Sequence, residues 1–414
     1  MPRSRSLLVV GLLALVAAAV GGLAGARLLT GGSASSPMPP MPQAAASTTA
    51  AKDPSAMPRR LPAASLFVAP GGEDGGACTA EAPCKSFDAA YHAARPGQVV
   101  QLAGGDYGNQ AFTPDTAKGG SGCESDAELG ACVILHPARG ARVVVDSLDF
   151  GTNYKNAGPA GIAIVADGRR SLVTTSTNFA QAREIALWGL DSQNIYVTGG
   201  RDIAIRGGRV GGQTSPDGLH PEIQGVYGAV PAIVPTRLTI EDVYFHDINT
   251  TSPTAHVDCL QIESGTEIVI RGNQFVRCGS TGLRVSYGGG ANENPPRHLL
   301  IEDNVFRNCV ATPVSACYYA AQLGIGHDVL VRHNTSEQAF QPAGDPQLAS
   351  HVRYVNNLAP GVTCEAGVSY VGNHWVKGTC SRSDRKVDMR RITAALRGKP
   401  VDTAAGARTP LAVG

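Results

Sequence analysis

The stretch HVDCLQIESG, residues 256–265, gathers side chains whose types could do chemistry together. It sets the imidazole of His256 and the carboxylates of Asp258 and Glu263 beside the amide of Gln261. An imidazole titrates near neutral pH and can accept a proton, and carboxylates can hold a hard cation such as calcium. The same residues would also suit a solvated surface without activity. The choice depends on the elements that position them.

A repeated pattern of short apolar segments surrounds this stretch. Segments such as RLTIEDVYFHD, TEIVIRGNQFVRC and RHLLIEDNVFRNC alternate apolar and polar residues and then carry a polar pair. Alternation with a period of two predicts strands with one buried face, and the repetition predicts a β solenoid. Asparagines recur at one place in successive copies, where they predict a turn with stacked, mutually bonded amides: Asn273, Asn304, Asn334, Asn357 and Asn373.

Alignment of the repeats predicts a ladder of three polar residues. The segment CLQIESGTEIVI aligns without gaps with AAQLGIGHDVLV, which matches Gln261 with Gln322. The intervening segment TGLRVSYGG matches its apolar positions to those of CLQI and places Arg284 in the same register. Neighbouring strands lie about 4.8 Å apart. We therefore expect these three side chains to lie one above another on the outward face.

The outward face around this ladder is the candidate site. A turn or bulge at Cys259 would bring all the polar residues of the stretch to the solvent side, as bulges do near active sites. The predicted patch comprises His256, Asp258, Gln261, Glu263, Arg284, Ser286 and Gln322, with Tyr287, Tyr318 and Tyr319 close by as possible platforms for sugar rings. The alternative is plain scaffold, in which stacked amides satisfy one another. Asp217 and His220, in TSPDGLHPE, could overhang the groove, but we expect a loop without a role.

The N-terminal segments lie outside the predicted fold. Arg3 and Arg5 precede an apolar run over residues 7–26 that ends in Ala-Gly-Ala, so residues 1–26 are predicted to be a secretory signal peptide or an uncut membrane anchor. Residues 27–64 are rich in Ala, Ser, Thr, Pro and Gly and predict a flexible linker. The repeats then predict a β-helix over residues 65–376 and a C-terminal cap and tail over residues 377–414.

Ten cysteines follow the linker, and an even number in an exported chain favours disulfides. The simplest pairing joins neighbours in sequence and leaves Cys259 and Cys278 over; the neighbouring pairs are Cys78 with Cys84, Cys123 with Cys132, Cys309 with Cys317, and Cys364 with Cys380. No CxxC pair occurs, so a cysteine-based zinc site is not expected. The formal net charge of +1 gives no reason to expect a nucleic-acid partner.

The segment LFVAPGGEDGGACTAEAPCKSFDAAYHAARPGQVVQLAGGDY, from Leu66, resembles the opening of secreted β-helix proteins of the pectate-lyase-like superfamily. The resemblance extends over residues 66–375, and residues 400–404 resemble the closing loop of such proteins. It implies an all-β fold, a single-stranded right-handed parallel β-helix with an N-terminal capping helix near residues 86–94. Such a helix covers a sheet edge that would otherwise pair with other chains.

The resemblance also implies a function, namely extracellular action on a carbohydrate. We expect a polysaccharide lyase that cleaves an acidic glycan by β-elimination, which needs a base and a partner that neutralises the sugar carboxylate. The resemblance implies Arg284 as the base and Asp258 and Glu263 as calcium ligands, with His256 as the alternative base. The motifs of polygalacturonase-like hydrolases and pectin methylesterase-like enzymes are missing. We expect a secreted monomer, with no membrane contact beyond a possible N-terminal anchor.

The rival interpretation is a non-catalytic carbohydrate-binding or cell-surface protein on the same scaffold. A lyase needs a base and a neutralising partner that converge on one groove. A binding solenoid needs only contacts spread along its surface. The discriminating observation is whether Asp258, Glu263 and Arg284 converge.

Overall fold

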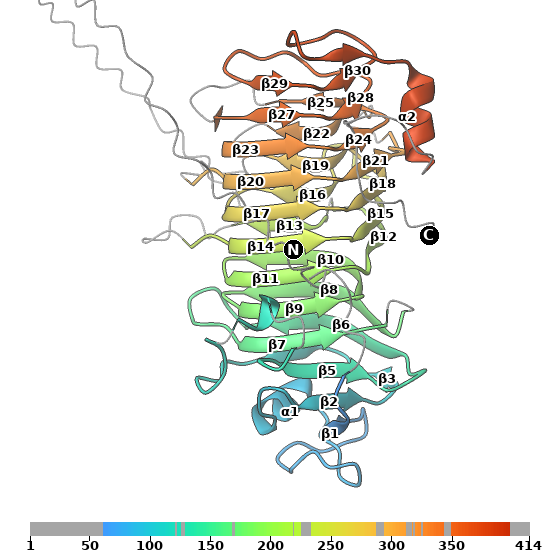
Figure 1. Cartoon of the computed structure of the whole chain (residues 1–414). Coiled ribbons are helices and arrows are strands. Elements are labelled where there is room, and N and C mark those ends of the chain that lie inside the picture. The colour runs from blue at the N-terminus through green and yellow to red at the C-terminus, as the bar shows by residue number, and fades with distance from the viewer. Residues whose placement is uncertain are drawn as a thin grey trace, which may run out of the picture. The chain divides into compact units, whose positions relative to one another are not determined.

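The computed structural model describes residues 61–120, 122–125, 129–167, 170–217, 219–224, 233–286, 294–311, 317, 319–323, 326–342 and 349–397 (Figure 1). The predicted signal or anchor, residues 27–60 of the predicted linker, and the closing loop at residues 400–404 lie outside these ranges. In the described part of the chain, no helix has the length and apolar character needed to cross a membrane.

One long sheet is built from a strand of every coil. In the described part of the chain it has 13 strands, which pair in parallel, and along its main path each strand follows its neighbour by one turn of the chain (Figure 1). In order they are β1 (Ala64–Val68), β2 (Val99–Leu102), β5 (Val133–Pro137), β7 (Ala160–Val165), β9 (Arg183–Trp188), β11 (Arg201–Arg206), β14 (Thr236–Glu241), β17 (Thr266–Arg271), β20 (Arg297–Glu302), β23 (Gly326–Arg332), β27 (Arg353–Val355) and β29 (Ser369–Val371), with β26 (Ala349–Ser350) also beside β23.

The remaining strands form a second face that divides along the solenoid. The first coils contribute β3 (Gly105–Asp106), β4 (Gln110–Phe112), β6 (Val143–Phe150), β8 (Leu172–Ala180) and β10 (Asp191–Thr198). The strand β10 then pairs with two shorter strands, and two parallel stacks continue from them. One stack is β12 (Arg209–Ser215), β15 (Tyr244–Thr250), β18 (Gln274–Cys278), β21 (Val305–Arg307), β24 (Thr335–Ser336), β28 (Leu358–Ala359), β30 (His374–Trp375) and β31 (Arg385–Lys386). The other is β13 (Glu222–Gln224), β16 (Asp258–Ile262), β19 (Thr281–Val285), β22 (Tyr319–Leu323) and β25 (Ala339–Gln341).

Aligned apolar side chains fill the interior, because parallel strands in register place equivalent residues one above another. One aliphatic row runs through six coils: Ile185, Ile203, Leu238, Ile268, Leu299 and Val329. The rings of Phe245, Phe275 and Phe306 stack with centroids 5.0 Å and 4.8 Å apart. All these side chains are buried. The predicted fold class, an all-β right-handed parallel β-helix, is confirmed.

A short helix closes the N-terminal end, as predicted. The helix α1 (Phe87–Ala93) begins after Ser86, whose hydroxyl accepts a hydrogen bond from the backbone N–H of Ala89 at 3.0 Å. Phe87 and Tyr91 face the core, where the Tyr91 ring meets Phe112 edge-on. At the other end, α2 (Met389–Leu396) buries Ile392 and Leu396 against β21 and β28.

The predicted asparagine ladder is present and fully buried. In each rung the side-chain oxygen accepts a hydrogen bond from the backbone N–H of the previous asparagine, as Asn304 does from Asn273 at 2.9 Å. The ladder ends on Asp384, which accepts from Asn373. One detail differs from the expectation: the left-handed residue is the one before the asparagine, for example Asp303 with φ 57°.

Five disulfides join all ten cysteines, and they include each predicted neighbour pair. The remaining two, Cys259 and Cys278, also pair and tie β16 to β18. Disulfides persist in oxidising compartments, so they are consistent with the predicted extracellular location.

Candidate functional site

The predicted ladder forms on the stack of β13, β16, β19 and β22. Gln261 pairs with Arg284, and Arg284 pairs with Gln322. The alternating residues of these strands belong to the core, as expected from the repeat alignment. The structure extends the ladder by one position that the alignment missed, because Glu222 on β13 pairs with Gln261.

A change of phase at Cys259 brings the polar residues together, as predicted. Cys259 and Leu260 are consecutive, yet both belong to the hydrophobic core. Gly282 occupies the equivalent place on the next coil, where a Cβ atom would lie 2.5 Å from the Phe306 ring. Because two successive residues face inward here, Asp258 lies on the same side of the strand as Gln261 rather than opposite it.

Two imidazoles converge on the Gln261 amide. The Nε2 atoms of His220 and His256 lie 3.0 Å and 3.1 Å from Gln261 Oε1, which can accept a hydrogen bond from each. The amide nitrogen of Gln261 donates to Glu263 Oε1 at 2.7 Å. His256 Nε2 also lies 3.5 Å from Asp258 Oδ2. Among the predicted site residues, His256, Asp258, Gln261 and Glu263 therefore form one cluster.

The cluster is buried rather than displayed on an open face, which corrects the sequence-based picture. The exposed fractions of Asp258, Gln261 and Glu263 are 0 %, 5 % and 3 %. The His256 side chain is 41 % exposed and borders solvent. Burial raises the pKa of Asp258, while the nearby charges of His220, His256 and Arg284 and the Thr281 hydroxyl act in the opposite direction.

A pair of glutamates adjoins the cluster. Burial and the neighbouring Glu263 carboxylate raise the pKa of Glu222 to about 8. Glu222 is therefore mostly protonated at neutral pH, so its hydroxyl can donate to Glu263. This arrangement resolves the repulsion that two buried carboxylates in contact would otherwise have.

The other predicted residues are placed less tightly. The Nε–H of Arg284 donates to the Ser286 hydroxyl at 3.0 Å. Gln322 and Tyr319 are half-buried on β22, while Tyr287 and Tyr318 lie outside the described residues. Asp217 is exposed in its loop. His220, expected to have no role, instead lies inside the cluster; the signal that could have found it is the match of Glu222-Ile223 to Gln261-Ile262.

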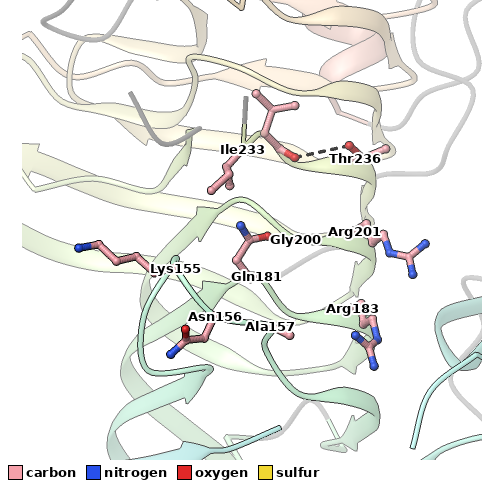
Figure 2. A pocket seen from close by; sticks show the side chains of 10 residues that line it. Lys155, Asn156, Ala157, Gln181, Arg183, Gly200, Arg201, Ile233 and Thr236 are labelled. Atoms are coloured by element: carbon pink, nitrogen blue, oxygen red, sulfur yellow. Dashed lines mark hydrogen bonds between the residues drawn. The ribbon is translucent and has the colours of Figure 1, made fainter. Parts of the chain in front are cut away.

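A hollow of about 370 Å³ lies where β9, β11 and β14 begin (Figure 2). Its lining includes Lys155, Arg183 and Arg201, and none of the described residues that line it is acidic. In Figure 2 the lysine and the two arginines extend to opposite sides. These cations therefore border the hollow without converging, unlike the groups around Gln261. The sequence analysis did not identify this basic hollow.

Comparisons with known proteins concern the fold only. No family model matches the chain, and no curated protein matches it. Among solved structures, pectate lyase Pel9A covers 84 % of this chain and 89 % of its own at 12 % identity, with a TM-score of 0.40. Pectin methylesterase PemA from Erwinia chrysanthemi covers 84 % and 99 % at 11 % identity, with a TM-score of 0.21. Similarities this low carry no argument about activity. The resemblance to pectate-lyase-like β-helices is confirmed for the fold by the chain's own parallel strands.

Proposed function

We propose that this protein is a polysaccharide lyase that cleaves an acidic glycan by β-elimination. The observation that supports it most is convergence: the buried carboxylate of Asp258 lies within the electrostatic reach of His220, His256 and Arg284. An imidazole that can accept a proton lies 3.5 Å from this carboxylate, and a guanidinium that can neutralise a sugar carboxylate stands on the next strand of the same stack. This is the arrangement that a lyase needs and that a purely binding surface does not.

We divide the roles differently from what the resemblance implied. A guanidinium stays protonated in proteins, so we assign Arg284 to the sugar carboxylate rather than to proton removal. We assign His256 as the base. When the Nε2–H of His256 donates to Gln261, the lone pair of the imidazole lies on Nδ1. Nδ1 is then the atom that can accept the proton from the sugar carbon next to the sugar carboxylate. Asp258 stabilises the imidazolium that results. As the C=C bond forms, the bond from the sugar carbon to the glycosidic oxygen breaks, and the departing oxygen takes a proton from the imidazolium or from water.

The predicted calcium site finds little support in the geometry. Calcium takes six to eight oxygen ligands. In the described residues Asp258 faces two imidazoles, whereas Glu263 is engaged by Gln261 and Glu222. The two carboxylates thus have different partners. No step of the proposed reaction is assigned to calcium.

The test is an absorbance assay for the unsaturated product, at about 235 nm, where elimination at a uronate produces its signal. Purified protein would be incubated with pectate, alginate and glycosaminoglycans, with calcium and with chelator. We expect activity on one uronate, lost in His256→Ala and Arg284→Ala and retained in Asp217→Ala, an exposed loop control. Activity that survives both site substitutions would contradict the assignment of the site. Absence of product from every uronate would contradict the lyase.

One observation favours the alternative of non-catalytic glycan binding. Lys155, Arg183 and Arg201 surround the basic hollow without converging, which suits contacts with several sugars of an acidic chain. Retention of inactive protein on an acidic-glycan column, weakened in an Arg183→Ala/Arg201→Ala variant and unchanged in His256→Ala, would establish this function instead.

A further inference from the structure

We propose that His220, His256 and Asp258 form a binding site for a divalent transition-metal ion. One ligand atom from each of the three residues lies within 4.8 Å of the other two. No other group of three or more potential ligands meets this criterion in the part of the chain that the structure describes. The site requires nothing from the proposed lyase reaction and would exist in a binding protein as well.

The buried state of Asp258 is a second and independent indication. Its side chain is 0 % exposed, and within the described residues neither Oδ1 nor Oδ2 meets the geometry of a hydrogen bond, although the Thr281 hydroxyl lies nearby and His256 Nε2 lies 3.5 Å from Oδ2. A buried carboxylate without such partners is costly. A cation held between Asp258 and the two imidazoles would supply the missing interaction. The adjacent residue, Cys259, is fixed by its disulfide to Cys278, so the carboxylate cannot easily turn toward water.

Three of the distances between the candidate ligand atoms fit a small tetrahedral ion. For metal–ligand bonds of 2.0–2.1 Å, neighbouring ligand atoms of a tetrahedron lie about 3.3 Å apart. His256 Nε2 lies 3.5 Å from Asp258 Oδ2, and Gln261 Oε1 lies 3.0 Å and 3.1 Å from the two Nε2 atoms. The amide oxygen is thus placed to be a fourth ligand, oriented by its own hydrogen bond to Glu263.

The donor set selects the kind of metal. Two imidazoles with one carboxylate suit zinc, copper, nickel or iron, whereas calcium and magnesium prefer oxygen alone. Zinc, which has no redox chemistry, is the simplest probe of the site.

Metal binding has one consequence that rests on the proposed function. A metal on His256 Nε2 places the remaining ring proton on Nδ1, so the imidazole can no longer act as a base. Zinc is therefore expected to inhibit the lyase reaction and chelator to restore it.

The test is isothermal titration calorimetry of chelator-treated full-length protein with zinc chloride, with calcium chloride as a second titrant. We expect one zinc per chain, little heat from calcium, and an affinity at least about tenfold weaker in His220→Ala and in Asp258→Asn, since tenfold is lost even when only a hydrogen-bond partner of a ligand is removed. Circular dichroism checks that each variant is folded. If Asp258→Asn does not fold, His220→Ala decides, because His220 lies outside the strands.

The matched control is His351→Ala. His351 and His298 flank the Asp328 carboxylate at 2.9 Å and 3.5 Å, but both imidazoles are more than half exposed, and among the described residues this trio does not bring one ligand atom of each member close to both others. Zinc binding that is lost in His351→Ala and kept in His220→Ala would overturn the proposed site, as would the absence of saturable binding in the unmodified chain. The zinc titration uses no glycan, so it tests the metal site alone, whereas the absorbance assay tests the lyase. Failure of one proposal can therefore be distinguished from failure of the other.

Discussion

Gln261 and Arg284 occupy equivalent positions on neighbouring coils, paired across β16 and β19. Gln261 bonds two imidazoles through its oxygen and Glu263 through its nitrogen. Arg284 therefore adjoins a residue that connects the basic and acidic sides of the cluster. This relationship places a fixed positive charge one strand away from a buried network of hydrogen bonds, and the first prediction tests that network.

Gln261→Ala should destabilise the protein by about 1–3 kcal/mol, because it removes the donor to the buried Glu263 carboxylate. The matched control is Gln322→Ala, two coils along the same ladder and half-buried, which should change stability by less than about 0.5 kcal/mol. Urea denaturation of both variants provides the comparison. Equal losses would mean that the Gln261 amide acts only as scaffold.

Glu222→Gln should make the protein more stable than the unmodified chain at high pH. The pKa of Glu222 is about 8 in the folded protein and near 4.5 in the unfolded chain, so the folded state holds the extra proton between these values. The unmodified chain consequently loses stability as the pH rises from about 4.5 to 8, whereas the neutral amide does not titrate. Thermal unfolding at pH 5 and pH 9, in chelator so that no metal contributes, measures the difference. A variant that gains nothing at pH 9 relative to pH 5 would refute the raised pKa.

Asn304→Ala should lower the free energy of unfolding by about 2–4 kcal/mol. The substitution leaves two buried donors of Asn273, its backbone N–H and its side-chain NH2, without their acceptor. Asn156→Ala, which changes an exposed asparagine in a loop, is the control and should have little effect. Guanidinium denaturation distinguishes the two. A small loss at Asn304 would show that the ladder is dispensable for stability.

Replacing Cys259 and Cys278 by alanine should lower stability by about 3 kcal/mol, as expected for a closed loop of this length. The Cys364–Cys380 pair has a similar sequence separation, 16 residues against 19, and its removal should cost a comparable amount. Only the loss of the first disulfide should also weaken zinc binding, because Cys259 precedes Leu260 at the change of phase and adjoins Asp258. Weaker zinc binding in both double variants would point to a general loss of structure.

The sequence predicted those parts of the site that follow from repetition. The apolar alternation fixes which side chains face inward, and the gap-free alignment of two repeats places Gln261, Arg284 and Gln322 in one register. Equivalent reasoning found the asparagine ladder and the disulfides between cysteines close in sequence. These features were accessible because they depend on local pattern or on a constant repeat length.

The membership and depth of the cluster were decided by the tertiary structure. His220 and Glu222 precede or begin a strand of three residues, too short to show an alternation, and reach the cluster only because that strand pairs with β16. The burial of Asp258 likewise depends on what packs over it. The sequence by itself determined the scaffold and the ladder, because a stacked repeat relates residues at a constant offset. Only the folded chain decided which irregular segments meet that ladder, because their contacts join positions that no repeat relates.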